Sequence, residues 1–77
     1  MNTARIQIML KPGVLDPQGE AICHSLDAIG FDDVTSVRQG KVIELDVAEG
    51  TTRERVRDMC DTLLVNSIIE TYTIDME

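Results

Sequence analysis

The sequence predicts an α+β fold in which two helices cover one face of an antiparallel sheet. Residues 4–11 alternate between apolar and polar side chains, which is the period-two pattern of a strand with one buried face. Two later segments, one after Asp16 and one after Glu54, carry apolar residues at helical spacing. Shorter alternating segments follow each helix. The resulting order is β-α-β-β-α-β, and the economical packing for it is a two-layer sandwich.

Residues 11–19 contain the signals that end the first strand and begin the first helix. Pro12 cannot continue a strand ladder, and Gly13 can adopt a positive φ. Asp16 is a favourable N-cap residue. Pro17 suits the first helical position, because the N–H that proline lacks would have no partner there.

The first helix is predicted to end at Gly30, because glycine favours the positive φ that closes many helices. Its apolar stripe consists of Ile22, Leu26 and Ile29, with Ala21, Cys23 and Ser25 beside it. Two strands are predicted to follow, at residues 34–39 and 41–47, and Gly40 between them suggests a tight hairpin. The inward face of the strand at residues 41–47 consists of Ile43, Leu45 and Val47.

The second helix is predicted to begin with a capping box, in which Thr51 is the cap and Glu54 reaches back to it. Its residues at helical spacing are Val56, Met59, Cys60, Leu63 and Leu64. Asn66 is expected to end the helix in the left-handed conformation. The last strand is predicted at residues 68–76, with Tyr72, Ile74 and Met76 on one face.

The composition indicates one small domain spanning residues 1–77. Two cysteines and one histidine cannot build a disulfide framework or a metal site by themselves, so association with other chains is expected to add stability. Cys23 and Cys60 are expected to be buried, reduced thiols. The formal charge of −7 disfavours nucleic acid and anionic membranes as partners. Without an apolar run long enough for a signal peptide or a membrane span, a cytoplasmic location is expected.

Motifs for nucleotide binding and nucleophilic catalysis are absent from the sequence. A phosphate-binding loop needs Gly-x-x-x-x-Gly-Lys followed by Ser or Thr, and neither residues 13–20 nor residues 40–42 match it. Cys23 and His24 are neighbours on a helix, so their side chains diverge by about 100° and do not form a nucleophile–base pair. No catalytic, cofactor-binding or metal-binding residue is therefore predicted.

Several sequence blocks, in order along nearly the whole chain, resemble one known family. The most specific is K-P-G-V-L-D-P-Q-G at residues 11–19. The others are L-D-A-I-G-F at 26–31, V-R-Q-G-K at 37–41 with I-E-L at 43–45, Met59-Cys60, Leu63-Leu64, and N-S-I-I-E at 66–70. Together they resemble the PurS family, the small subunits of phosphoribosylformylglycinamidine synthase. Ser67 departs from the family pattern, which often has proline after the asparagine.

The resemblance implies a PurS-like, ferredoxin-like fold and a function that composition alone does not indicate. The synthase is an ATP-dependent ligase of de novo purine biosynthesis, which converts formylglycinamide ribonucleotide to the amidine with glutamine as nitrogen donor. A large synthetase subunit performs the ligation, and a glutaminase subunit releases ammonia. The small subunit is implied to be a non-catalytic adaptor that bridges these two subunits and supports ammonia transfer. The complex is expected to use ATP and Mg, with no cofactor bound by this chain alone.

Two surfaces are candidates for contacts with partners. The first gathers scarce basic residues near the first turn and the predicted hairpin; it comprises Arg5, Lys11, Pro12, Gly13, Val14, Leu15, Asp16, Arg38, Gly40 and Lys41. Its cations are expected to pair with acidic groups on a partner subunit, although turn and capping chemistry alone also explains Pro12, Gly13 and Asp16. The second is the uncovered face of the sheet, expected to form a homodimer or homotetramer through Met9, Val37, Val42 and Ile69.

A module of another class also fits the predicted order of elements. Regulatory modules of the ACT type share the strand–helix order and often have Pro-Gly at the first strand–helix turn, as Pro12 and Gly13 do here. Such a module binds an amino acid at a dimer interface. The longer match over residues 11–19 favours the synthase subunit. Thermal stabilisation by a free amino acid would discriminate between the two, because a ligand that binds only the folded state raises Tm.

Overall fold

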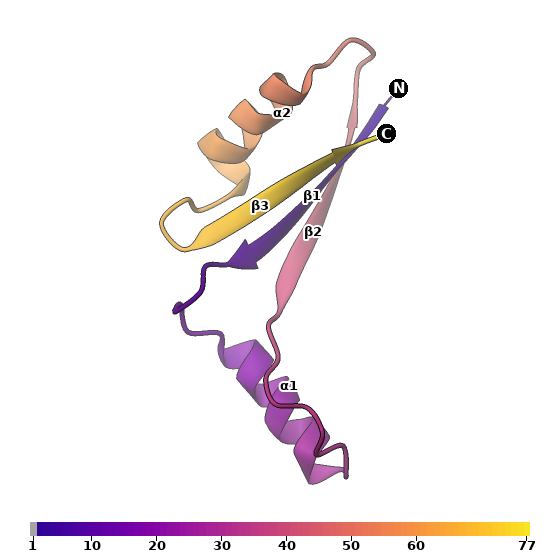
Figure 1. Cartoon of the computed structure of the whole chain (residues 1–77). Helices are drawn as coiled ribbons and strands as arrows, with labels where there is room; N and C mark the ends of the chain where they lie inside the picture. Colours follow the sequence, from indigo (N-terminus) through magenta and orange to yellow (C-terminus); the bar gives the residue numbers. More distant parts are fainter. Residues whose placement is uncertain (1) are drawn as a thin grey trace.

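The computed structural model describes residues 2–77, which contain three strands and two helices (Figure 1). The strands are β1 (Asn2–Leu10), β2 (Gly40–Val47) and β3 (Glu70–Met76). The helices are α1 (Pro17–Ala28) and α2 (Arg53–Met59), and α2 continues directly into a π-helical turn, η1 (Cys60–Leu64). The predicted α+β class with an antiparallel sheet is confirmed.

The sheet has β1 at its centre, in the order β2-β1-β3, and both pairings are antiparallel. Ile6 of β1 lies opposite Ile43 of β2 and Ile74 of β3. Because side chains alternate across a strand, these three residues share one face of the sheet. Helix α2 packs over this face on the side of β3 (Figure 1).

The core lies between this inner face and the helical segment formed by α2 and η1. Its buried members are Ala4, Ile6, Ile8, Val56, Cys60 and Val65, and the partly buried residues packed against them are Ile43, Leu45, Leu64, Tyr72, Ile74 and Met76. The alternation of β1 and the helical spacing of Val56 and Cys60 predicted most of this set. Since full burial of a large aliphatic side chain contributes about 1.5–3 kcal/mol, a core this small leaves little margin.

The strand predicted at residues 34–39 is absent from the sheet, and so is the hairpin predicted at Gly40. The segment instead returns beside α1 to the start of β2, which begins at Gly40 (Figure 1). Its hydrogen bonds explain the difference. The backbone N–H of Gln39, for example, donates to the carboxylate of Asp16 at the base of α1 rather than to a neighbouring strand.

Helix α1 does not lie over the sheet, as the predicted sandwich required, but extends beyond one end of it (Figure 1). The described chain is consequently long and flat, with principal extents of 49 × 25 × 14 Å. The apolar stripe predicted for α1 remains largely in solvent, where Ile22 is 40% and Ile29 is 70% exposed. Only α2 therefore forms a second layer with the sheet.

The ends of the helices follow the predicted signals, with two corrections. Asp16 caps α1 as expected, and Gly13 and Gly30 have positive φ angles of 88° and 101°. The cap of α2 is Thr52 instead of Thr51, because the Thr52 hydroxyl accepts a hydrogen bond from the Arg55 N–H at 3.1 Å. No left-handed asparagine ends the second helical segment, since among residues 2–77 only glycines have positive φ.

We predict that Ile6→Ala lowers the free energy of unfolding by about 2–5 kcal/mol, because it opens a cavity at the centre of the sheet. Ile6 is fully buried, whereas Val42 on the opposite face of the sheet is 54% exposed. Val42→Ala, which also deletes methyl groups, is expected to change stability by about 0.5 kcal/mol or less. Urea unfolding of both variants measures the difference, and similar losses in the two would contradict this description of the core.

Candidate partner-binding surfaces

The carboxylate of Asp16 joins α1 to the chain that leads into β2. Its Oδ1 accepts a hydrogen bond from the Gly19 N–H at 2.9 Å, and its Oδ2 accepts one from the Gln39 N–H at 2.7 Å. The donor from Gln39 is the main reason why the pKa of Asp16 lies below its ordinary value, followed by the donor from Gly19. Partial burial raises the pKa of Asp16, and the nearby Arg38 guanidinium lowers it.

Two further contacts hold the base of α1 against residues 37–39. The side-chain amide of Gln39 donates to Gln18 Oε1 at 2.8 Å. Gly19 is buried, and a Cβ atom at this position would lie 2.6 Å from the carbonyl oxygen of Val37. Only glycine allows the first turn of the helix to approach the returning chain this closely.

The loop at residues 11–16, predicted to contact a partner, lies at the same end of the sheet as Arg38 and Gly40 (Figure 1). The Lys11 N–H donates to the Ile69 carbonyl at 2.8 Å, which joins this loop to the turn before β3. Arg38 Nη2 donates to the Leu10 carbonyl at 2.5 Å. The loop, α1 and residues 35–39 surround an open hollow of about 740 Å³. The structure therefore gathers most of the first predicted surface in one place.

Arg5 lies away from that place, in the middle of β1 and on the face opposite α2. Its guanidinium is 3.7 Å from Glu44 Oε1 on β2, and both side chains are about half exposed. An exposed pair of this kind contributes little, about 0–1 kcal/mol. Arg5 is therefore separated along β1 from the first loop, and its contact with a partner stays a prediction.

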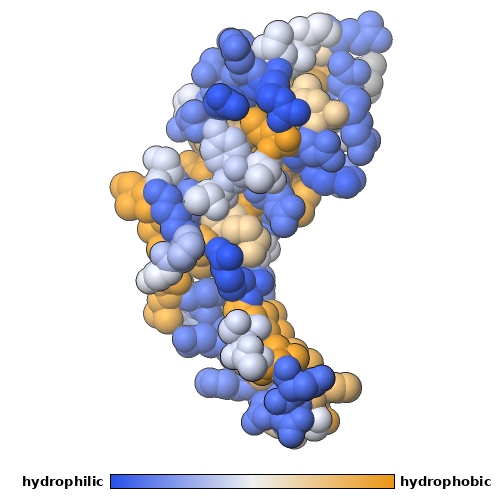
Figure 2. Space-filling model, in the orientation of Figure 1, coloured by the Kyte–Doolittle hydropathy of each residue, from blue (hydrophilic) through white to orange (hydrophobic). Residues whose placement is uncertain are grey.

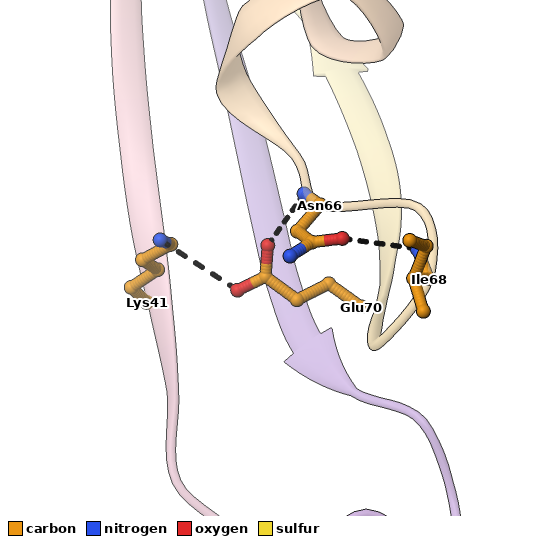
Figure 3. A network of polar contacts seen from close by, with 4 residues as sticks. All are labelled: Lys41, Asn66, Ile68 and Glu70. Carbon is orange, nitrogen blue, oxygen red and sulfur yellow. Dashed lines mark hydrogen bonds and ion pairs between the residues drawn. The ribbon is translucent and has the colours of Figure 1, made fainter.

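Lys41 takes part in a network within the chain, which sequence analysis missed (Figure 3). Its Nζ lies 3.6 Å from Glu70 Oε2, and the other oxygen of Glu70 accepts a hydrogen bond from the Asn66 N–H at 2.8 Å. Asn66 Oδ1 in turn accepts from the Ile68 N–H at 3.1 Å. The network joins β2 to the turn before β3, so part of the charge of Lys41 is already balanced inside the chain.

The four residues predicted for a dimer face do not share one surface. Met9 and Val42 lie on the open face of the sheet, because each alternates with core residues of its strand. Val37 lies in the connection before β2, and Ile69 lies in the turn before β3. The rest of the open face is polar; it includes Thr3, Arg5, Gln7, Glu44, Asp46, Thr71, Thr73 and Asp75. This face is less apolar than expected.

A groove beside α2 was also missed by sequence analysis. It is lined by Leu45, Arg55, Asp58, Met59, Thr62, Leu63 and Leu64, and has a volume of about 400 Å³. Leu63, which helical spacing placed in the core, is 82% exposed at its edge. The groove is open because α2 covers the β3 side of the sheet and α1 lies elsewhere. The helical spacing of Leu63 and Leu64 was visible in the sequence. The groove is open only because α1 lies beyond the end of the sheet.

Exposed apolar side chains also gather around α1 and the loops at that end of the sheet (Figure 2). They include Leu15, Ile22, Ile29, Phe31 and Val34, and at the neighbouring turn Ile68 and Ile69. Leu15 is 68% and Ile68 is 81% exposed. Exposed apolar side chains gathered at one end of a molecule commonly mark contact with other macromolecules.

The remaining titratable groups of interest support the fold. Cys23 and Cys60 are free thiols as predicted, although Cys23 is only half-buried. Burial raises the pKa of Cys60, so this thiol is protonated and unreactive near neutrality. The Tyr72 hydroxyl donates to Asp61 Oδ1 at 2.8 Å and joins η1 to β3. Burial, followed by this hydrogen bond, raises the pKa of Tyr72.

Neither a metal cluster nor a membrane helix was found in the part of the chain that the structure describes. Within residues 2–77, no three His, Cys, Asp or Glu side chains are grouped closely enough to hold a metal ion. The same residues include no helix of the length and apolar character that crossing a membrane requires.

Comparison with known proteins identifies the family. The family model PurS, described as phosphoribosylformylglycinamidine (FGAM) synthase, matches residues 3–77. The chain belongs to the PurS family. A curated relative from Synechocystis sp., phosphoribosylformylglycinamidine synthase subunit PurS, is 43% identical over 75 residues, which are 94% of this chain and 75% of the relative.

Solved structures of the PurS family have the same fold as this chain. Bacillus subtilis PurS in its C2 crystal form matches with a TM-score of 0.88 and 37% identity, over 100% of this chain and 99% of that one. A chain in the structure of PurLQS from Thermotoga maritima matches with a TM-score of 0.83 and 31% identity, over 99% and 96%. The PurS-like fold is thereby confirmed, and the chain is a PurS-type subunit of phosphoribosylformylglycinamidine synthase, an enzyme of purine biosynthesis.

We predict that Glu70→Ala destabilises this PurS chain more than Lys41→Ala. Loss of Glu70 removes both the ion pair and the hydrogen bond to the exposed Asn66 N–H, and such a hydrogen bond contributes about 0.5–1.5 kcal/mol, whereas loss of the half-exposed lysine removes only the ion pair, at about 0–1 kcal/mol. Thermal and urea unfolding of the two variants give the comparison. Equal losses would mean that the ion pair, and not the hydrogen bond to the turn, is the stabilising contact.

The pH dependence of stability is predicted to depend partly on Asp16. Because its pKa is lower in the folded chain than in the unfolded one, its stabilising contribution is fully present above the unfolded pKa of about 3.9 and is lost as pH falls through the folded pKa. The stability difference between wild type and Asp16→Asn should therefore shrink from pH 6 toward pH 2. A constant difference for Asp16→Asn would contradict the assignment.

Proposed function

We propose that the chain is a non-catalytic adaptor that bridges the synthetase and glutaminase subunits of phosphoribosylformylglycinamidine synthase and supports ammonia transfer between them. The main support is its full-length likeness to a chain of the Thermotoga maritima PurLQS structure. In this proposal the ATP, Mg, glutamine and formylglycinamide ribonucleotide bind to the other subunits. The chain supplies surfaces that hold those subunits in a fixed orientation relative to each other.

The shape of the chain suits such a role. The apolar residues Leu15, Ile68 and Ile69 occupy two loops that are held together by the hydrogen bond between Lys11 and Ile69. Because these loops are fixed to each other and to the end of β1, they form a preorganised surface, and binding through it costs little ordering of the backbone. Lys11 adds a cation beside this apolar surface. A partner surface with an apolar centre and an acidic rim would complement it.

Self-association into a homodimer or homotetramer is a second part of the proposal. The ridge of α1, with Ile22 and Ile29 exposed, and the groove beside α2 are both apolar and are uncovered in the same chain. The apolar ridge of α1 from a second copy would cover the groove of the first. Such an exchange would enlarge the small core.

The bridging function is tested by capture of purified synthetase and glutaminase subunits from the same organism on the tagged chain, with and without glutamine and Mg-ADP. Both subunits are expected to be recovered, and glutamine-dependent amidine formation should require all three proteins. Leu15→Ser should weaken capture about tenfold, since loss of a central apolar contact costs more than about 1 kcal/mol. Recovery of neither subunit, together with thermal stabilisation by a free amino acid, would support an amino-acid-binding module instead.

We predict that Leu63→Ser weakens self-association about tenfold while leaving the fold intact, because Leu63 lies at the groove and is 82% exposed. The matched control is Val42→Ser on the open face of the sheet, which should leave self-association unchanged. Sedimentation over a range of concentrations measures both variants. If Val42→Ser dissociates the copies and Leu63→Ser does not, the copies meet through the open face.

A further inference from the structure

The direction in which α1 leaves the sheet is set by a junction of three chain segments (Figure 1). These segments are the end of β1, the first turn of α1 and residues 37–39, which lead directly into β2. Arg38 Nη2 donates to the Leu10 carbonyl, which joins the third segment to the first. Asp16 joins the third segment to the second. Without these contacts α1 would be connected to the sheet mainly through the chain at its two ends.

The two oxygens of Asp16 have separate roles at this junction. Oδ1 accepts the Gly19 N–H and caps the helix, which is a local role that many N-cap residues have. Oδ2 accepts the Gln39 N–H, from a residue that is far away in the sequence and adjacent to the start of β2. A single rigid carboxylate therefore links the base of α1 to the base of β2. Rotation of the helix about its base would break one of these two bonds.

Close packing at Gly19 further restricts the directions in which α1 can leave the sheet. A Cβ atom there would meet both the Val37 carbonyl and the Asp16 carboxylate, so the first turn already rests against the returning chain. The bond between Gln39 and Gln18 lies on the same side of the junction. Together these contacts restrict α1 to one direction, which points away from the sheet.

The direction of α1 determines whether the groove beside α2 is open. The exposed Ile22 and Ile29 of α1 and the groove residues Leu45 and Leu63 belong to two uncovered apolar surfaces of one chain. If the helix folded back over its own sheet, these surfaces would cover each other and neither would be offered to another molecule. Held outward, the same helix can reach only the groove of a different chain.

We propose that Asp16 is a positioning residue that fixes the outward direction of α1 and thereby keeps the groove of its own chain open for a second copy. This inference rests on the self-association described under Proposed function. The role of Asp16 in setting the helix direction can nevertheless be measured on this chain alone, without any other subunit of the synthase.

The test separates the bridging role from the capping role by means of Asp16→Asn. Asparagine keeps one carbonyl oxygen that caps α1, but its NH₂ group cannot accept the Gln39 N–H. Spin labels at Ser25→Cys on α1 and Thr73→Cys on β3 report the distance between helix and sheet, in a background with Cys23→Ser and Cys60→Ala. Labelled chains are diluted with unlabelled chains, so that only distances within one chain contribute. Asp27→Asn on α1 is the matched control.

Wild type and Asp27→Asn are expected to give one narrow distribution of distances. Asp16→Asn should give a broad distribution that extends to shorter distances, with unchanged helix content by circular dichroism, and self-association about tenfold weaker. Gly19→Ala, which forces the helix base away from Val37, should broaden the distribution in the same way. A distribution for Asp16→Asn that superimposes on that of wild type would overturn the proposal, as would equal loss of self-association in Asp27→Asn.

Discussion

The carboxylate of Asp16 connects the two parts of this molecule, because one of its oxygens caps α1 and the other holds the chain that enters β2. The sheet with α2 has its own core, whereas α1 contributes little to it. The geometry of the whole chain therefore depends on a small junction of hydrogen bonds and one close glycine contact. A buried sheet–helix interface, which normally sets such an angle, is absent between α1 and the described strands.

This arrangement has an energetic consequence for a chain of 77 residues. A fold that places one of its two helices in solvent buries less apolar surface than the sandwich expected from the sequence, and small domains already have little surface to bury. In the proposed self-association, the uncovered ridge of α1 and the uncovered groove beside α2 from two copies would form the missing interface. A subunit of a multi-chain enzyme can complete such an interface with another chain, which a solitary protein cannot do.

The polar contacts near the loops show that residues predicted for a binding surface also stabilise the fold. Lys41 and Arg38 were singled out as cations for a partner, yet Lys41 pairs with Glu70 and Arg38 donates to the Leu10 carbonyl. Glu70, which sequence analysis did not single out, pairs with Lys41 and accepts a hydrogen bond from the Asn66 N–H. The loops at this end are thus held in place from within. Their exposed apolar residues, Leu15 and Ile68, remain available on a rigid base.

The sequence by itself determined much of the core and of the helix ends, because these features depend on local chemistry. Alternation placed Ala4, Ile6 and Ile8 in the core, and N-cap, proline and glycine preferences placed α1 within a residue or two. The block at residues 11–19 also indicated the PurS family. Tertiary structure alone decided the direction of α1, the loss of the strand at residues 34–39, the dispersal of Met9, Val37, Val42 and Ile69, and the groove at Leu63. The physical reason is that propensity and periodicity act over a few neighbouring residues, whereas these features depend on contacts between distant ones, such as Asp16 with Gln39.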